Sequence, residues 1–131
     1  MNKYAGLVLL ITLLYSCNKQ PIETTNINII GKWQLVESYD NYKTPNTFEW
    51  NTIPDSLKII TEYDNANNCT IWQNGAVFYT GKYTVDAHHI LLSSTSGTVD
   101  YNFLVLEKTA TNIAVSFKST YGTYQQKLKL L

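Results

Sequence analysis

The sequence contains no arginine: all ten of its basic residues are lysines, and ten acidic residues balance them. Arginine carries the planar, forked donors that favour recognition of phosphate and carboxylate groups, so ligands rich in these groups are disfavoured. The formal net charge is zero, and a chain without a basic surplus does not attract nucleic acid. We therefore expect no nucleic-acid partner.

Cysteine is also scarce, since the chain has only Cys17 and Cys69. If Cys17 is modified, one thiol remains and no internal disulfide can form, so packing alone must hold the fold together. No histidine or lysine neighbours Cys69 in the sequence to favour a thiolate. We expect Cys69 to be an inert, half-buried strand residue.

No apolar run is long enough to span a membrane. The longest extends over about 12 residues from Tyr4 to Tyr15, and a helix of that length covers about 18 Å of a hydrocarbon core about 30 Å thick. Lys3 precedes the run and Leu14-Tyr15-Ser16-Cys17 follows it. This order resembles the export signal of bacterial lipoproteins. The resemblance implies cleavage before Cys17 and acylation of that residue.

The signal divides the chain into three parts. We expect residues 1–16 to be a cleaved signal peptide, residues 17–28 a tether and residues 29–131 the folded domain. The tether has one proline, one acid and no aromatic side chain, a composition typical of a solvated linker. The resemblance implies several acyl chains on Cys17. Each buried acyl methylene contributes about 0.8 kcal/mol, so these chains would hold the protein firmly on the membrane. Asn18 replaces the aspartate that signals inner-membrane retention in some bacteria, which favours the outer membrane, facing the periplasm of the cell envelope.

The part that follows the tether has the pattern of an all-β domain. Its length suits a single core, and from Ile29 onward apolar residues alternate with period two, without helical spacing. The expected strands are Ile30 to Tyr39, Ser56 to Tyr63, Cys69 to Gln73, Ala76 to Thr80, Lys82 to Asp86, Ile90 to Ser94, Val99 to Leu106, Asn112 to Lys118 and Thr123 to Leu131.

Short connections between these strands favour an antiparallel meander. About eight twisted strands in this order are expected to close into an up-and-down β-barrel. Asn74-Gly75 favours a type I′ turn, because both central residues of that turn need positive φ. The turn would place Trp72 opposite Val77 and Ile71 opposite Phe78.

One connection, Asp40 to Asp55, is long. It carries three aromatic side chains among polar residues: Tyr42, Phe48 and Trp50. A loop of this length inside a compact domain is usually functional or disordered. We expect a packed lid.

Two short motifs carry a further resemblance. Gly31-Lys32-Trp33 opens the first strand soon after the tether, and Gly81-Lys82-Tyr83 begins a later strand and hairpin. Together with the meander, they resemble the lipocalins, specifically the small lipocalin-like domains of bacterial lipoproteins. The Thr-Asp-Tyr motif of lipocalins proper is missing, so ligand specificity is not carried over.

The resemblance also implies structural roles for residues in the first strand. Gly31 would let the chain turn in tightly, and Trp33 would plug the closed end of the barrel. In lipocalins a cation from the last strand lies over this ring. Here Lys127 or Lys129 would supply it, contributing about 0.5 to 1 kcal/mol.

An eight-stranded barrel either is filled by its own side chains or holds one small ligand. The residues expected to point inward would line such a ligand site: Leu57, Ile59, Tyr83, Tyr101, Phe103, Val115, Phe117 and Tyr124. We expect a small hydrophobic ligand, with a filled core as the alternative. The rival function is that of an accessory or scaffold lipoprotein contacting an envelope protein partner, because tyrosine supplies contact area at low entropic cost.

Enzymatic activity is not expected. The only histidines, His88 and His89, are adjacent at a predicted hairpin tip with one nearby carboxylate, Asp86. This set lacks the nucleophile, base and acid of covalent catalysis and the further ligands of a zinc site. We expect neither a metal nor another cofactor. Asp55-Ser56-Leu57 resembles the short O-glycosylation signal of some Gram-negative envelope proteins.

Overall fold

The structure is a computed structural model that describes residues 26–131. The expected export signal, Cys17 and the tether up to residue 25 lie outside the described residues. All regular elements of the described part are β-strands, which confirms the all-β class. The strands are β1 (Gly31–Asp40), β2 (Glu49–Thr52), β3 (Ile59–Tyr63), β4 (Asn68–Gln73), β5 (Ala76–Val85), β6 (His89–Ser93), β7 (Val99–Lys108), β8 (Asn112–Ser119) and β9 (Gly122–Leu130).

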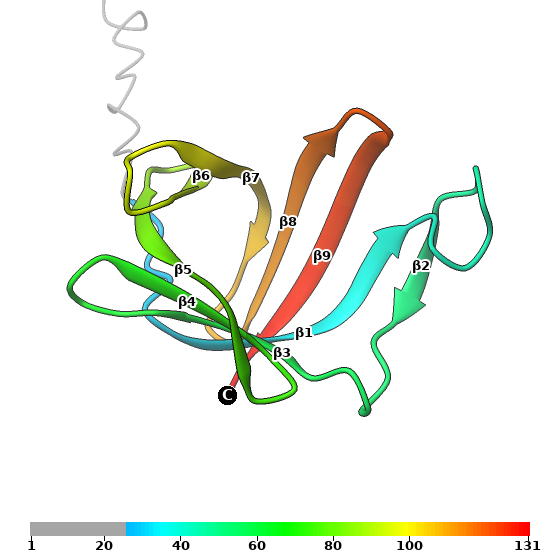
Figure 1. The fold of residues 1–131 in the computed structure, drawn as a ribbon, viewed down its shortest axis with the longest axis horizontal. Helices are drawn as coiled ribbons and strands as arrows, with labels where there is room; N and C mark the ends of the chain where they lie inside the picture. The colour runs from blue at the N-terminus through cyan, green and yellow to red at the C-terminus, as the bar shows by residue number, and fades with distance from the viewer. Residues whose placement is uncertain (1–25) are drawn as a thin grey trace, which may run out of the picture.

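Eight of these strands close into an antiparallel barrel (Figure 1). Strands β3 to β9 pair in chain order, β1 pairs with β3, and β9 returns to pair with β1. The closing register runs from Trp33 opposite Leu130 to Tyr39 opposite Gln125. The expected up-and-down barrel is therefore confirmed, and closure pairs the edges that an open sheet would expose.

The ninth strand, β2, lies within the segment expected to be a loop. Residues 37–40 of β1 pair with β2, whereas residues 31–34 of the same strand pair with β3. Beyond Gln34, β1 has parted from β3, and its free backbone groups on that edge are paired by β2. In Figure 1, β2 accordingly lies beside the cyan end of β1. The expectation of a loop from Asp40 to Asp55 is therefore wrong over residues 49–52.

The β4–β5 hairpin confirms the expected turn and corrects one of its two pairs. Asn74 and Gly75 have φ of 52° and 82°, as a type I′ turn requires. Trp72 faces Val77, but Ile71 faces Tyr79 because a β-bulge shifts the register by one residue. Phe78 is the extra residue of that bulge, and a bulge re-aims a side chain.

Strand β5 joins the two strands expected at 76–80 and 82–86, because Gly81 does not interrupt it. A Cβ at Gly81 would lie 2.3 Å from the Ser93 carbonyl oxygen and 2.5 Å from the Tyr79 hydroxyl. The glycine therefore permits the close approach of β6 and gives space to the Tyr79 ring.

The two ends of the barrel differ. We call the end where β1 begins the closed end; it also carries the turns after β3, β5 and β7. There, residues 26–30 run beside the β5–β6 turn, where Ile27 N donates to Asp86 O at 3.3 Å, and Ile29 and Trp33 are buried. The other end, the open end, carries the β4–β5, β6–β7 and β8–β9 hairpins and residues 41–48.

Candidate ligand-binding site

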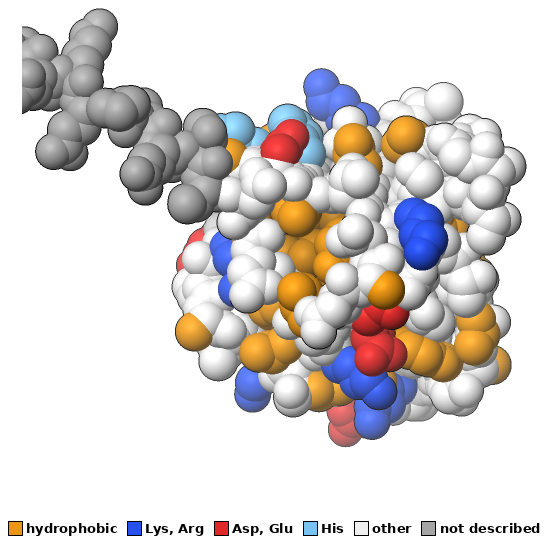
Figure 2. Space-filling view, turned by 90° about the vertical axis from the view of Figure 1, so that its left-hand side faces the viewer, with side chains coloured by type: hydrophobic (Ala, Val, Ile, Leu, Met, Phe, Trp, Pro, Cys, Tyr) orange, Lys and Arg blue, Asp and Glu red, His pale blue; other side chains and the backbone are white. Residues whose placement is uncertain are grey.

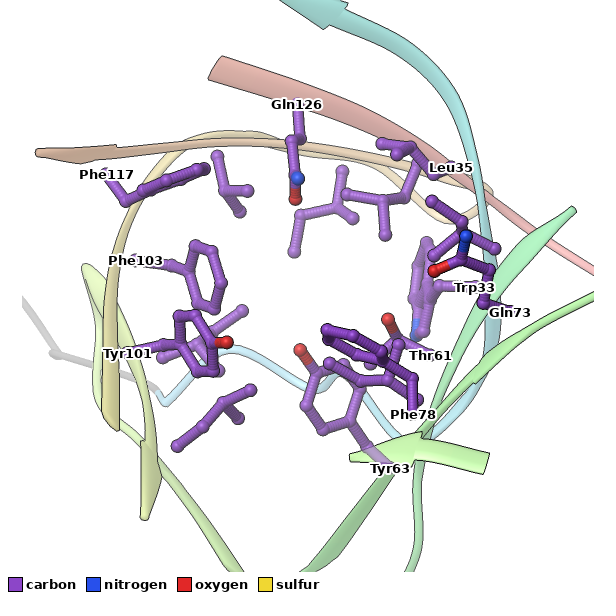
Figure 3. Close-up of a pocket in the computed structure, with 17 residues that line it drawn as sticks. Trp33, Leu35, Thr61, Tyr63, Gln73, Phe78, Tyr101, Phe103, Phe117 and Gln126 are labelled. Carbon is purple, nitrogen blue, oxygen red and sulfur yellow. The ribbon is translucent and has the colours of Figure 1, made fainter. Parts of the chain in front are cut away.

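A cavity of about 250 Å³ lies inside the barrel, and we call it the chamber. Figure 3 shows its side chains pointing from the surrounding strands toward an empty centre. Most are aliphatic or aromatic, and none carries a formal charge. The lining residues are Trp33, Leu35, Ile59, Thr61, Tyr63, Ile71, Gln73, Phe78, Ile90, Leu92, Tyr101, Phe103, Ile113, Val115, Phe117, Gln126 and Leu128.

Trp33 lies at the closed end of the chamber and is 2% exposed. Its indole Nε1 donates to the carbonyl oxygen of Ile29 at 2.7 Å, which ties the incoming chain to the ring. Gly31, two residues earlier, has a φ of 136°, and a Cβ there would lie 2.8 Å from Leu130 Cδ1. As expected, Gly31 lets the chain turn tightly into β1, where a larger residue would clash with Leu130.

The cation over Trp33 is Lys108, whose ammonium lies 5.0 Å from the ring centre. The expectation of Lys127 or Lys129 in this place is wrong. A bulge before Glu107 leaves Lys108 opposite the buried Ile113, at the closed end of β7. Lys127 instead lies 4.2 Å from the Trp50 ring and 2.6 Å from Glu37.

Hydroxyl groups lie toward the closed end of the chamber. Tyr63 is buried and packs edge-on against Tyr83, with ring centres 5.0 Å apart. Burial raises the pKa of Tyr63 far above its ordinary value, so this hydroxyl stays a neutral hydrogen-bonding group. The Tyr83 hydroxyl donates to the Asp64 carbonyl oxygen at 2.8 Å. Tyr83 therefore belongs to the core below the chamber.

A continuous series of aromatic rings surrounds much of the open end. Successive ring centres from Tyr79 through Tyr101 to Phe103 are 5.7 and 5.9 Å apart. The series continues from Phe103 through Phe117 to Tyr124, at 5.5 and 5.3 Å. Such separations are typical of favourable edge-on and offset contacts. The open end thus offers an aromatic wall to an apolar guest.

The structure divides the residues expected to point inward into three groups. Ile59, Tyr101, Phe103, Val115 and Phe117 line the chamber. Leu57 and Tyr124 line a second cavity beside it. Tyr83 lines neither cavity and is 5% exposed in the core.

The three aromatic residues expected to form a lid differ in their exposure and in the cavity that each lines. Phe48 packs on the β8–β9 hairpin, where a Cβ at Gly122 would lie 2.7 Å from its ring. Tyr42 is 83% exposed and lines the second cavity. Trp50 lies beside Lys127 and at a tilt to Tyr39, with ring centres 5.5 Å apart, and lines neither cavity. Two shared neighbours connect them: the Tyr124 ring contacts Tyr42 and Phe48, and the Tyr39 ring contacts Phe48 and Trp50.

Several lining residues were missed by sequence reasoning. Thr61 and Tyr63 continue the period-two pattern from Ile59, and Gln126 continues it from Tyr124, so alternation itself was a signal for them. Phe78 had no such signal. It lines the chamber only because of the bulge opposite Ile71 and Trp72.

The second cavity, of about 380 Å³, adjoins the chamber near residues 41–54. Four residues line both cavities: Leu35, Ile59, Phe117 and Gln126. Unlike the chamber, the second cavity has a buried carboxylate in its wall, that of Asp40.

No family model, curated protein or solved structure matches this chain. Between residues 26 and 131, no helix is long and apolar enough to cross a membrane.

The two histidines lie outside the chamber. His88 and His89 lie at the β5–β6 turn, where both backbone N–H groups donate to Asp86 Oδ1 and thereby hold the pKa of Asp86 low. In Figure 2 these histidines lie at the upper edge of the face, apart from the recess in which hydrophobic side chains gather. No cluster of three or more metal-binding side chains occurs in the described range.

Cys69 and Ser56 differ in their burial. Cys69 is fully buried rather than half-buried, and burial raises the pKa of its thiol to about 12. Such a thiol is a poor nucleophile at neutral pH. Ser56 is exposed in the turn before β3.

Proposed function

We propose that this protein is a lipid-anchored lipocalin-like lipoprotein that binds a small hydrophobic ligand in the cell envelope. The observation that carries the proposal is the uncharged, largely apolar chamber inside a closed barrel. Ligand pockets are mostly apolar, with a few polar groups that orient the guest. Thr61, Gln73 and Gln126 are polar groups of this kind in the chamber wall.

The volume of the chamber argues against a core that is simply filled. Protein interiors are close-packed and contain few voids larger than a water molecule. A cavity of about 250 Å³ that adjoins a second one of about 380 Å³ departs from that rule. The two cavities together approach the sizes that hold small molecules.

The position of the tether fits this function. Residue 26 and its neighbours run along the closed end, where Ile27 N donates to Asp86 O. A membrane anchor at Cys17 would therefore be attached at the closed end, opposite the aromatic wall. The open end would then be free to exchange ligand with the periplasm.

Native mass spectrometry tests the proposal directly. Within residues 26–131 every buried core residue lies between positions 29 and 128, so the mature chain with Cys17→Ser retains the complete barrel without the acyl anchor. Protein purified from cells in this form should carry an apolar small molecule. A second measurement uses N-phenyl-1-naphthylamine, an uncharged dye that fluoresces in apolar cavities. Apo mass together with no dye binding would contradict the proposal.

The accessory function is a second candidate because the open end exposes large apolar side chains. Val77, Phe78, Val99 and Tyr121 are between 53% and 80% exposed and lie in or beside its three hairpins. Exposed apolar patches mark contact sites on soluble domains. Crosslinking in intact envelopes should then capture one reproducible protein partner, and the absence of any would remove this candidate.

A further inference from the structure

The second cavity contains a buried carboxylate that only neutral groups satisfy. Asp40 is 5% exposed. Its Oδ1 accepts hydrogen bonds from Tyr42 N and Asn51 Nδ2, both at 3.1 Å, and its Oδ2 accepts one from Ser38 Oγ. Three donors and no acceptor around the two oxygens are the surroundings expected of an ionised carboxylate.

The protein supplies this carboxylate with no cation from the part of the chain that is described. The lysine–carboxylate pairs found there are Lys32–Glu62 and Lys127–Glu37, and His89 Nδ1 lies 3.5 Å from Asp86 Oδ1. Buried charges in proteins are normally paired with an opposite charge, because isolating them from water is costly. A positively charged group beside Asp40 would therefore stabilise its carboxylate.

A buried acceptor without a hydrogen-bond partner, the amide oxygen of Asn51, lies next to Asp40. Asn51 is 7% exposed and lines the same cavity. Its Nδ2 is used by Asp40 and by the Glu49 carbonyl oxygen, whereas its Oδ1 has no hydrogen-bond partner within residues 26–131. A buried amide oxygen without a donor is uncommon in folded proteins. This oxygen has almost no accessible surface and does not itself reach the cavity, but its partial negative charge lies beside that of Asp40. Together they favour a positive charge in the cavity.

Aromatic rings complete the surroundings. Tyr39, Tyr42 and Tyr124 line the cavity, and the ring centres of Tyr42 and Tyr124 are 6.4 Å apart. The faces of such rings attract cations, and cages of them recognise alkylated ammonium groups. A carboxylate behind aromatic rings is therefore chemistry suited to an ammonium group.

We propose, on the basis of the proposed function, that the second cavity binds the ammonium head group of an amphiphile whose apolar part occupies the chamber. Four residues line both cavities, so the two cavities adjoin, and the head group and the apolar part of one amphiphile can lie on either side of these side chains. The ligand class is thus an apolar chain or ring carrying a primary or quaternary ammonium group.

Lys43 is the one cation in the wall of this cavity, and it is exposed. An exposed ammonium remains solvated and forms only a weak ion pair. It therefore does not offset the buried charge of Asp40. The competing prediction, an anionic amphiphile held by Lys43, is decided by the same experiment.

The experiment measures displacement of N-phenyl-1-naphthylamine from the mature Cys17→Ser protein. The competitors are decyltrimethylammonium, decylamine and decanoate, which share one chain length and are used below their micelle concentrations. We expect at least one ammonium compound to displace the dye at a concentration at least about tenfold lower than decanoate. The stronger of the two identifies a quaternary or a primary head group. Equal displacement by all three, or preference for decanoate, would overturn the inference.

Asp40→Asn is the decisive variant, because it removes the charge and keeps the shape. It should raise the displacing concentration of the preferred ammonium compound about tenfold or more and leave decanoate unweakened. Glu107→Gln, an exposed residue remote from both cavities, makes the same change in net charge and should have no effect. Unchanged ammonium binding in Asp40→Asn would also overturn the inference. If this variant fails to fold, displacement of the dye from the parent protein by the three competitors still tests the inference.

The two proposals fail in distinguishable ways. Absence of dye binding by the parent protein contradicts the chamber itself and with it the proposed function. Dye binding without preference for ammonium leaves the chamber intact and removes only the head-group site.

Discussion

Trp33 is the residue that closes one end of the barrel. Its ring is buried, its indole N–H is bonded to Ile29 and the ammonium of Lys108 covers it. Trp33→Ala should lower the free energy of unfolding by about 3 to 5 kcal/mol, because it removes a large buried ring and leaves a cavity. Urea unfolding measures this loss.

Trp50 provides the matched control for that substitution. It is 42% exposed on the outside of β2, and its replacement by alanine should cost clearly less than that of Trp33. A loss below about 1 kcal/mol for Trp33→Ala would contradict its role as a plug.

Buried acidic groups make the protein sensitive to alkaline pH. Burial raises the pKa of Cys69 from 9.0 to about 12. Burial, and next a hydrogen bond to Asp100, raise the pKa of Tyr79 from 10.0 to about 12. The folded state thus holds these protons more tightly than the unfolded chain does. Their contribution to stability is complete below about pH 9 and is lost as the pH rises toward about 12.

The free energy of unfolding should therefore fall steadily above about pH 9. Urea unfolding at a series of pH values measures the slope. Cys69→Ala should flatten the first part of the decline, because it removes the group that ionises earliest in the unfolded chain. A constant free energy between about pH 8 and 11 would contradict this prediction.

At the scale of elements, glycines set the turn geometry in two different ways. Gly75 and Gly97 have φ of 82° and 84°, and a Cβ on either would meet nothing within 4 Å. Alanine at each should cost about 1 kcal/mol, from backbone strain alone. Gly31→Ala should cost more, because a Cβ there also meets Leu130. Equal unfolding free energies for Gly31→Ala and Gly75→Ala would show that the contact with Leu130 is unimportant.

Strand β2 shows an element that local sequence does not specify. Glu49–Thr52 has four residues and lies among polar turn formers, so the alternation of apolar and polar residues there is too short to predict a strand. It becomes a strand because β1 offers a free edge beyond Gln34. The ordering of Asn51 beside Asp40 depends on this pairing.

At the scale of the whole molecule, the chamber exists only because all eight strands close around it. Gln126 lines both cavities, so a larger side chain there should fill the space that they share. Gln126→Trp should weaken dye binding more than about tenfold while the barrel still folds, because the added ring occupies cavity space and does not overpack a filled core. Dye titration and circular dichroism measure the two effects. Lys129→Trp, exposed on the same strand, should bind dye normally.

The amino-acid sequence by itself determined the all-β class, most strands and the chain-ordered meander. Period two in the β8 residues and the Asn74-Gly75 turn express local backbone preferences, which need no distant partner. Gly31 and Trp33 were found by a motif, and the structure places both at the closed end. The inward direction of Ile59, Phe103 and Val115 followed from alternation alone.

The tertiary structure decided the features that depend on register between distant segments. Bulges in the β4–β5 and β7–β8 pairs turn Phe78 into the chamber and Lys108 over Trp33. Alternation cannot foresee a bulge, because one extra residue changes the face of every residue after it. The contact between Asp40 and Asn51, like the space inside the barrel, arises only when strands far apart in sequence meet. Strand periodicity is local, whereas register, cavity volume and the burial of a charge are properties of the closed barrel.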